Sequence, residues 1–224
     1  MPWRAWWTAS PGRGRLYGMA NDFFDKVYRT TEPDAVETLY DDWAGSYDAD
    51  VTGNGYKTPG RVAAALAAQL PERGTPILDF ACGTGLSGAA LAAQGFAVID
   101  GCDLSAPMLE TARARGIYRH LVKLAPDEAP AAAPGDYGAI AAVGALSPGA
   151  APAHYLDILL DRLVPGGLLA LSYNDHTLAD PAYTDRLARA LETGTVVERV
   201  REHGDHLVEL GATSTVYILE KQAG

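Results

Sequence analysis

The sequence predicts an α/β fold: a mainly parallel sheet, covered by helices on both faces, that ends in an antiparallel hairpin. Three features indicate it. Short apolar runs alternate with helical stretches from about residue 76 onwards, a pattern typical of parallel sheets because parallel neighbours need a crossover connection. A glycine-rich turn follows the first apolar run. Near the end, two strand-like runs leave no room for a crossover helix between them, so they must pair antiparallel.

Two helices are expected before the sheet. The first spans residues 33–44, with Thr31 placed to cap it and Asp34 supplying an acid in its first turn. The second spans residues 59–70, with Thr58 as its expected N-cap. We expect these helices to form a lid over the ligand site.

The sheet is expected to contain seven strands, at residues 76–80, 97–101, 119–124, 137–143, 168–173, 196–203 and 214–221. The helices expected between them span residues 86–94, 106–115, 153–163 and 181–191. Gly95 and Gly116 stand where the C-terminal caps of two of these helices belong. The order of the runs therefore predicts one continuous sheet.

The composition limits the class of partner. The chain has 224 residues and a formal net charge of -10, and it lacks the clusters of Lys and Arg that give proteins affinity for a nucleic-acid backbone. No apolar run approaches the length of a membrane span. Cys82 and Cys102 are the only cysteines, so no disulfide framework is expected. We expect a cytoplasmic protein with no nucleic-acid or membrane partner and no metal.

The strongest motif is ILDFACGTGLSG, at residues 77–88, where a strand ends and a helix begins. Gly83, Gly85 and Gly88 match the pattern G-x-G-x-x-G, which permits a tight turn and close approach of a ligand to the backbone. The following strand leads to Asp103, whose carboxylate can accept hydrogen bonds from both ribose hydroxyls of an adenosine. This combination predicts a nucleotide-type cofactor.

Asp79 distinguishes between two cofactor classes. A dinucleotide places its pyrophosphate at the helix N-terminus, where a carboxylate would repel it. The same carboxylate suits the ammonium and sulfonium groups of S-adenosylmethionine. Asp79 has an alternative role, as a structural acid that accepts backbone N–H groups within the turn. Either role disfavours NAD, so the residues favour S-adenosylmethionine.

These residues carry a family resemblance. ILDFACGTGLSG, IDGCDLSAPMLETA and LVPGGLLALSY resemble the class I S-adenosylmethionine-dependent methyltransferases. More narrowly, LYDDWAGSYDADV, VGALSPG, LSYND, HGDH and STVYILEK resemble the methyltransferase-like protein 27 group, named for the Williams–Beuren syndrome region. The resemblance covers about residues 39–221. It implies a Rossmann-like, seven-stranded sheet of order 3-2-1-4-5-7-6 with one reversed strand.

The resemblance also implies roles for individual residues. The methionine end of the cofactor would be surrounded by Asp79, Cys82, Gly83 and Gly85, with Tyr47 contacting the cofactor carboxylate from the lid. The ribose would be held by Asp103, with Leu104 and Met108 against the adenine. The sulfonium would be bordered by Val143 and Gly144, which open towards the substrate.

Several of these residues have a plainer explanation. Met108 lies at helical spacing and would serve equally as a core residue. Tyr47 could pack in the lid without touching a ligand, and Cys82 could be a small turn residue rather than a nucleophile. The segment LVKLAPDEAP departs from the family, because Leu124 or Ala125 stands where many class I enzymes place an acid near the adenine. Asp127 could substitute if the loop folds back.

The reaction implied is methyl transfer to a small molecule by in-line displacement. A base for the acceptor proton would come from His176, His203 or His206, each of which has an acid nearby in sequence, although surface or loop positions explain them as well. Two other functions stay open: a non-catalytic module that binds S-adenosylmethionine, and an NAD-dependent oxidoreductase. The acceptor, its reacting atom and the oligomeric state are not indicated.

The expected organisation has three parts. Residues 1–18 hold three tryptophans, three arginines and no acid. We expect a disordered tail there, or sequence upstream of a true start at Met19, in preference to an interfacial anchor. Residues 19–72 are expected to form the lid, and residues 73–224 the methyltransferase domain.

Overall fold

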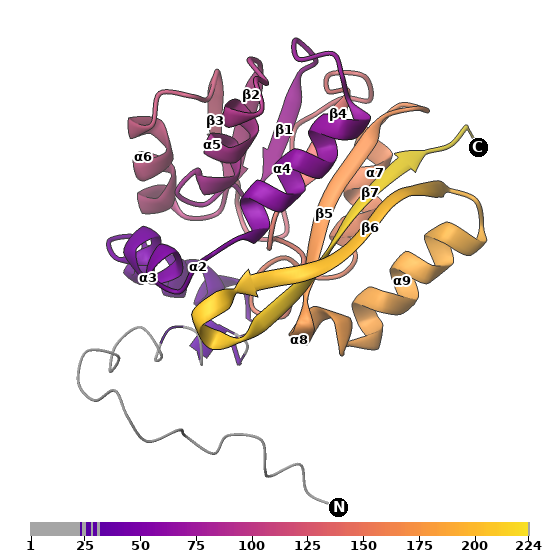
Figure 1. Ribbon diagram of the computed structural model, residues 1–224. Helices are drawn as coiled ribbons and strands as arrows, with labels where there is room; N and C mark the ends of the chain where they lie inside the picture. Colours follow the sequence, from indigo (N-terminus) through magenta and orange to yellow (C-terminus); the bar gives the residue numbers. More distant parts are fainter. Residues whose placement is uncertain (1–22, 24–25, 28, 31, 224) are drawn as a thin grey trace, which may run out of the picture.

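The computed structural model describes residues 23, 26–27, 29–30 and 32–223 of the chain. Seven strands form one sheet of order β3-β2-β1-β4-β5-β7-β6 (Figure 1). They are β1 (Ile77–Phe80), β2 (Ile99–Asp103), β3 (His120–Lys123), β4 (Ala139–Ala142), β5 (Leu168–Asn174), β6 (Val196–Leu207) and β7 (Ala212–Lys221). Only β7 runs against its neighbours β5 and β6. The predicted order and the reversed strand are both confirmed.

Helices connect and cover the strands. They are α2 (Pro33–Trp43), α3 (Tyr47–Gly53), α4 (Thr58–Gln69), α5 (Leu86–Ala93), α6 (Ala106–Ala114), α7 (Tyr155–Arg162), α8 (Asp175–Leu178) and α9 (Pro181–Glu192), with a short 3-10 turn η1 (Val208–Leu210). The short helices α3 and α8 were not expected from the sequence. Helix α8 forms because the Asn174 side chain caps it by accepting the Thr177 N–H at 3.0 Å.

Two strand boundaries differ from the prediction for identifiable reasons. Strand β2 runs through Gly101 to Asp103, because Gly101 is packed inside the sheet, where a Cβ would lie 2.9 Å from the Cys82 sulfur. Strand β6 continues to Leu207, since the Arg61 guanidinium of α4 donates to the carbonyls of Glu202 and Asp205. A side chain from a distant helix thus supports the polar end of β6.

The predicted helix caps have mixed outcomes. Gly95 and Gly116 adopt left-handed backbone after α5 and α6, with φ values of 89° and 67°, so both are confirmed as C-terminal caps. The expectation that Thr58 is an N-cap was wrong. Thr58 is the first residue of α4, and its hydroxyl bonds to His206 and Ser214 instead. Thr31 and the segment 1–18 lie outside the described residues.

The core lies on both faces of the sheet because strand side chains alternate between them. On one face, α4 and α5 pack on Ile77, Ala139 and Ala170. On the other, α7 and α9 pack on a cluster that includes Leu78 and Leu169. No helix in the described part of the chain is long and apolar enough to cross a membrane.

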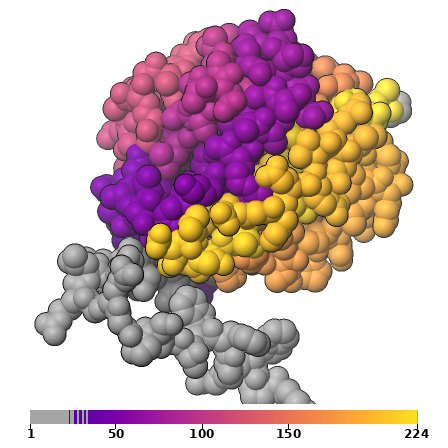
Figure 2. Space-filling view, viewed as in Figure 1, coloured from indigo at the N-terminus to yellow at the C-terminus, as the bar shows by residue number. Residues whose placement is uncertain are grey.

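Helices α2 and α3 lie beyond the carboxyl ends of the parallel strands, next to the tip of the β6–β7 hairpin (Figures 1 and 2). The segment that joins α3 to α4 pairs with the end of β6: the Lys57 N–H donates to the His206 carbonyl at 2.9 Å, and Tyr56 forms an isolated bridge with Leu207. Helix α4 itself packs against β5, β6 and β7. We use the name lid below for α2 and α3 alone; that residues 19–72 form a separate lid unit stays a prediction.

A core substitution tests this packing. Leu169 is fully buried in β5, so Leu169→Ala should lower the free energy of unfolding by about 2–5 kcal/mol through lost burial and a residual cavity. Urea denaturation followed by circular dichroism measures the change. Val208→Ala, at a side chain that is 42% exposed, is the control and should alter stability by less than about 0.5 kcal/mol. Equal effects of the two changes would contradict the described core.

Candidate functional site

The glycine-rich turn links β1 to α5 through residues in left-handed backbone. Ala81, Gly83 and Gly85 have φ values of 52°, 54° and 88°. A Cβ on Gly83 would meet no atom within 4 Å, whereas one on Gly85 would lie 3.0 Å from the side chains of Arg115 and Tyr118. Gly83 therefore borders open space, and Gly85 serves close packing. Left-handed backbone costs a non-glycine residue such as Ala81 about 1–2 kcal/mol.

Asp103 lies at the end of β2 and holds this turn in place. Its Oδ2 accepts the N–H of Gly83 at 2.8 Å, and its Oδ1 accepts the N–H of Ser105 at 2.9 Å. Burial raises the pKa of Asp103, and the backbone hydrogen bonds oppose that shift. The carboxylate thus joins two neighbouring turns at the carboxyl edge of the parallel strands, where α/β proteins bind ligands.

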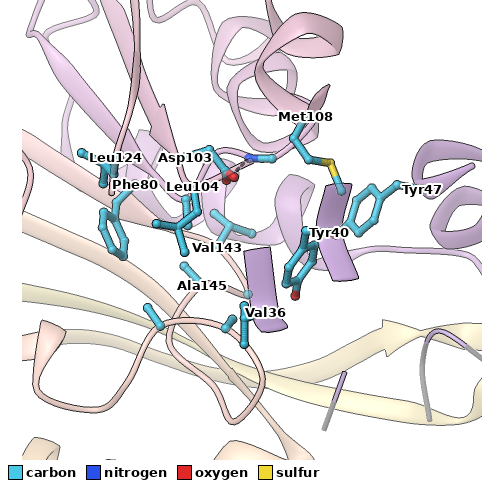
Figure 3. A pocket seen from close by; sticks show the side chains of 15 residues that line it. Val36, Tyr40, Tyr47, Phe80, Asp103, Leu104, Met108, Leu124, Val143 and Ala145 are labelled. Atoms are coloured by element: carbon cyan, nitrogen blue, oxygen red, sulfur yellow. Dashed lines mark hydrogen bonds between the residues drawn. The ribbon is translucent and has the colours of Figure 1, made fainter. Parts of the chain in front are cut away.

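Asp103 lines a pocket of about 690 Å³, counted out to open solvent. Figure 3 shows the Asp103 carboxylate between two walls, with Phe80 and Leu124 on one side and Tyr40 and Tyr47 of the lid on the other. Seven of the ten residues expected to hold the cofactor line this pocket: Tyr47, Gly83, Asp103, Leu104, Met108, Val143 and Gly144. Residues from β1, β2, β4 and the lid are therefore brought together.

The pocket has an apolar end where the family pattern would place an acid. Leu124, at the end of β3, lines it and is buried. Asp127 stands on an exposed loop and is outside the pocket lining. Asp103 is thus the charged side chain that lines the pocket, and the end at Leu124 offers apolar contact.

Two smaller cavities adjoin this pocket. One is lined by Cys82 and Gly83 and shares Tyr47, Ala81 and Val143 with the main pocket. Burial raises the pKa of the Cys82 thiol well above its usual value, which keeps the thiol neutral and makes it a poor nucleophile. Cys82 therefore contributes a small side chain to the turn.

The other, which we name the inner chamber, has a volume of about 480 Å³, counted out to open solvent, and shares Tyr40, Tyr47 and Gly144 with the main pocket. Its remaining lining residues are Val27, Trp43, Val51, Tyr56, Ser147, Asn174, His206 and Leu207. Gly144 marks the boundary: its N–H donates to Ser172 Oγ at 2.8 Å, and a Cβ there would lie 3.1 Å from the Tyr56 hydroxyl oxygen. No charged side chain is among the described residues that line the inner chamber.

Asp79 lies beneath the turn and lines none of the three cavities. It is fully buried, and its Oδ2 accepts the hydroxyls of Ser87 and Tyr118, each at 2.7 Å. Its Oδ1 is a buried acceptor without a hydrogen-bond partner in the described structure. Burial raises the pKa of Asp79 to about 6. This buried acceptor would be satisfied by a cationic donor.

The three candidate histidines have different surroundings. His176 and His203 are exposed and line no described cavity. His206, in contrast, is buried and faces the inner chamber. Burial lowers the pKa of His206 to about 4. Within the residues that the structure describes, no three His, Cys, Asp or Glu side chains form a group suited to a metal ion.

Polar contacts tie the lid to the sheet edge. Asp48 of α3 pairs with Arg115 and accepts the Thr84 hydroxyl of the glycine-rich turn. Asp41 of α2 accepts the Ser105 hydroxyl. The sequence did not predict these contacts, because the partners lie far apart along the chain.

The aromatic side of the site was predicted only through Tyr47; Tyr40 and Trp43 were missed, although the sequence held a signal. Tyr40, Trp43 and Tyr47 recur at intervals of three and four residues. Residues at this spacing lie on one face of a helix. Trp43 is buried and packs edge-to-face against Tyr47, with ring centroids 4.8 Å apart. Ala81, which lines two cavities, could not have been identified without its backbone conformation.

Comparisons with known proteins agree with this geometry. Residues 77–167 match a family described as a methyltransferase domain. The human protein named methyltransferase-like protein 27 is 41% identical over 147 residues, which are 62% of this chain and 59% of the human protein. The match thus spans less than two thirds of that relative.

Solved structures share the fold at low sequence identity. The [4+2]-cyclase SpnF has a TM-score of 0.66 at 16% identity, covering 87% of this chain and 98% of its own. Magnesium protoporphyrin IX methyltransferase of Synechocystis PCC 6803, solved with S-adenosylmethionine, has a TM-score of 0.58 at 17% identity, covering 92% of each chain. The 1,6-didemethyltoxoflavin-N1-methyltransferase of Burkholderia thailandensis, solved with 1,6-didemethyltoxoflavin and S-adenosylhomocysteine, has a TM-score of 0.60 at 17% identity, covering 87% of this chain and 92% of its own.

The residues at the site fit an S-adenosylmethionine-type ligand. A carboxylate lines the pocket, an open face at Gly83 permits close approach to the backbone, and an unsatisfied buried oxygen of Asp79 lies behind the turn. The sheet order, the family match and the human relative point the same way. Residues 77–167 thus match a methyltransferase domain, and the chain is similar to methyltransferases in sequence and in fold.

Proposed function

We propose that this protein transfers the methyl group of S-adenosylmethionine to a small molecule bound in the inner chamber. The observation that carries the proposal is the placement of Asp103. Its carboxylate is fixed by the N–H groups of Gly83 and Ser105 and lines the main pocket at the carboxyl edge of the sheet. An acceptor of ribose hydroxyl protons belongs at such a position.

The cofactor would lie along the main pocket. Asp103 would hold the ribose, and Leu104 and Met108 would contact the adenine, together with the apolar Leu124. In Figure 3, Met108 lies beside Tyr47, and Leu124 lies on the other side of the Asp103 carboxylate.

The methionine end would extend towards the smaller cavity at Cys82 and Gly83. Its ammonium group would be the partner of Asp79, and Tyr47 would contact its carboxylate. Val143 and Gly144 would then border the sulfonium. Because Gly144 also lines the inner chamber, the methyl group would face that chamber.

S-Adenosylmethionine supplies a methyl group activated by a positive sulfur: the sulfur–carbon bond breaks while a lone pair of the acceptor forms the new bond. The protein has to align the two partners and exclude water. The lid residues Tyr40, Trp43 and Tyr47 line the inner chamber and supply apolar surface for that purpose. A chamber that adjoins the main pocket at Gly144 would permit an in-line approach.

A small acceptor is supported by the size of the inner chamber. Its volume is about 480 Å³, counted out to open solvent, and residues of the lid line it. The net charge of -10 opposes binding to nucleic acid. The Burkholderia thailandensis relative, with a small molecule bound beside the cofactor product, shows that this fold accommodates such an arrangement. We further propose a cytoplasmic location, because both cysteines are buried free thiols.

Calorimetric titration tests the cofactor. S-Adenosylmethionine and S-adenosylhomocysteine should bind the full-length chain at micromolar concentrations, and NADH should not. Asp103→Ala should weaken both affinities by about 1–3 kcal/mol, through lost charge-assisted hydrogen bonds to the ribose. Glu110→Ala removes an exposed carboxylate from the neighbouring helix α6 and should leave both affinities unchanged. Binding of NADH alone would overturn the proposal.

A matched pair of glycine substitutions tests the close approach of the cofactor to the turn. Gly83 and Gly116 both have left-handed backbone, and a Cβ at either position would meet no atom within 4 Å, so a valine strains both sites similarly. Gly83→Val should abolish cofactor binding because its side chain occupies the pocket, whereas Gly116→Val, beyond the far end of α6, should bind normally. Isothermal titration and thermal unfolding of both variants measure the difference. Normal binding by Gly83→Val would contradict the placement.

The pH dependence of cofactor binding tests Asp79. Its pKa, raised to about 6 by burial, means that the free protein carries a proton there in acid, which a bound ammonium group must displace. The affinity for S-adenosylmethionine should therefore be constant above about pH 7 and fall towards tenfold per unit below pH 6. Asp79→Asn should bind more weakly and lose this dependence. Dissociation constants measured from pH 5 to 8 for both proteins give these results. The same pH dependence in Asp79→Asn and in the unmodified protein would exclude a contact between Asp79 and the ammonium group.

A further inference from the structure

One buried polar side chain of the inner chamber, His206, is held by a chain of hydrogen bonds that starts at Arg61 of α4. Arg61 Nη1 donates to Ser214 Oγ at 3.1 Å. Ser214 Oγ and Thr58 Oγ1 are 2.9 Å apart, and Thr58 Oγ1 lies 2.8 Å from Nδ1 of His206. Thr58 and Ser214 are both fully buried. Each hydroxyl proton in this chain therefore needs an acceptor inside the protein.

The direction of donation follows from Arg61, because a guanidinium can donate hydrogen bonds but not accept them. Ser214 Oγ accepts from Arg61, and the acceptor that the described structure offers to its proton is Thr58 Oγ1. The Thr58 proton is then directed to Nδ1 of His206. The reverse direction would leave the buried Ser214 proton without an acceptor.

The charge state of His206 agrees with this direction. Burial lowers its pKa to about 4; Asp175 opposes this shift, while Arg61 and His176 add to it. The imidazole is therefore neutral at physiological pH and carries one proton. Since Nδ1 accepts from Thr58, that proton resides on Nε2. In this tautomer, neither ring nitrogen is free to accept a proton from a substrate.

We propose that His206 positions the methyl acceptor by donating a hydrogen bond from Nε2–H to an oxygen atom, and that the acceptor is an uncharged, ring-containing compound with a hydroxyl or carbonyl group. This deepens the proposed function and rests on it. The described lining of the chamber is neutral and includes the aromatic residues Tyr40, Trp43, Tyr47 and Tyr56, of which Tyr56 contacts the imidazole. His206 cannot take a proton from the acceptor atom, so an acceptor that carries one would lose it to bulk solvent after methyl transfer has made it acidic.

The orientation of the imidazole is fixed by packing as well as by hydrogen bonds. The Tyr56 ring meets the His206 ring edge-on, with centroids 5.2 Å apart and an angle of 89° between the planes. The His206 carbonyl accepts the Lys57 N–H at 2.9 Å. Backbone and ring are therefore both held, as a positioning residue requires.

The tautomer is tested without any acceptor. Long-range ¹H–¹⁵N correlation spectra of the labelled full-length chain distinguish the two neutral forms of its five histidines, and His206→Gln assigns the signal. We expect the Nε2–H form to predominate at pH 7 in the unmodified protein and in Thr58→Ser, which both have the hydroxyl donor. In Thr58→Val, which lacks it, the Nε2–H form should no longer predominate. An Nδ1–H form or an imidazolium in the unmodified protein would overturn the proposal.

Phenol and toluene test donation into the chamber, because they share shape but differ in the oxygen. With S-adenosylhomocysteine present, phenol should shift the His206 Nε2–H resonance and bind more tightly than toluene or benzoate. His206→Phe should weaken phenol binding about three- to tenfold without affecting toluene, and His206→Gln should restore it. Tighter binding of benzoate, or equal loss of phenol and toluene, would refute the inference. Failure of S-adenosylhomocysteine itself to bind would instead refute the proposed function, leaving the tautomer result intact.

Discussion

The site depends on one half-buried carboxylate. Asp103 accepts an N–H from the glycine-rich turn and another from the turn before α6, and these bonds oppose the loss of hydration that burial imposes. Two turns that follow different strands are thereby kept at a fixed separation. The width of the main pocket, the position of Gly83 and the approach of the lid through Ser105 and Asp41 all follow from this constraint.

The sequence predicted those parts of the fold that local patterns determine. The strand order came from the family motifs, and the reversed strand came from the missing crossover. The end of β2 was misplaced, because Gly101 marks close packing with Cys82 rather than a strand end. The extension of β6 depends on Arg61, which is more than 140 positions away along the chain. Local patterns carry no information on such contacts.

The candidate site likewise contains residues that local patterns predict and residues that depend on distant contacts. Gly83 and Asp103 belong to a motif with fixed spacing, and the structure brings them to one pocket. The three histidines could not be ranked from sequence, because each has an acid nearby. Burial separates them: His206 lies inside, and His176 and His203 lie on the surface. The bond from Thr58 to His206 joins residues 148 positions apart, which explains why the same threonine was mistaken for a helix cap.

The ties between the lid and the glycine-rich turn have a kinetic consequence. Asp48 of α3 binds Thr84 of that turn and Arg115 beyond it, so the lid is held by the segment that a cofactor must approach. A ligand that enters between the lid and this turn has to displace these contacts, so its association rate would be limited by the frequency with which they open. Increasing ionic strength, which screens the exposed part of the ion pair, would then accelerate both capture and release of the cofactor while leaving their ratio nearly constant.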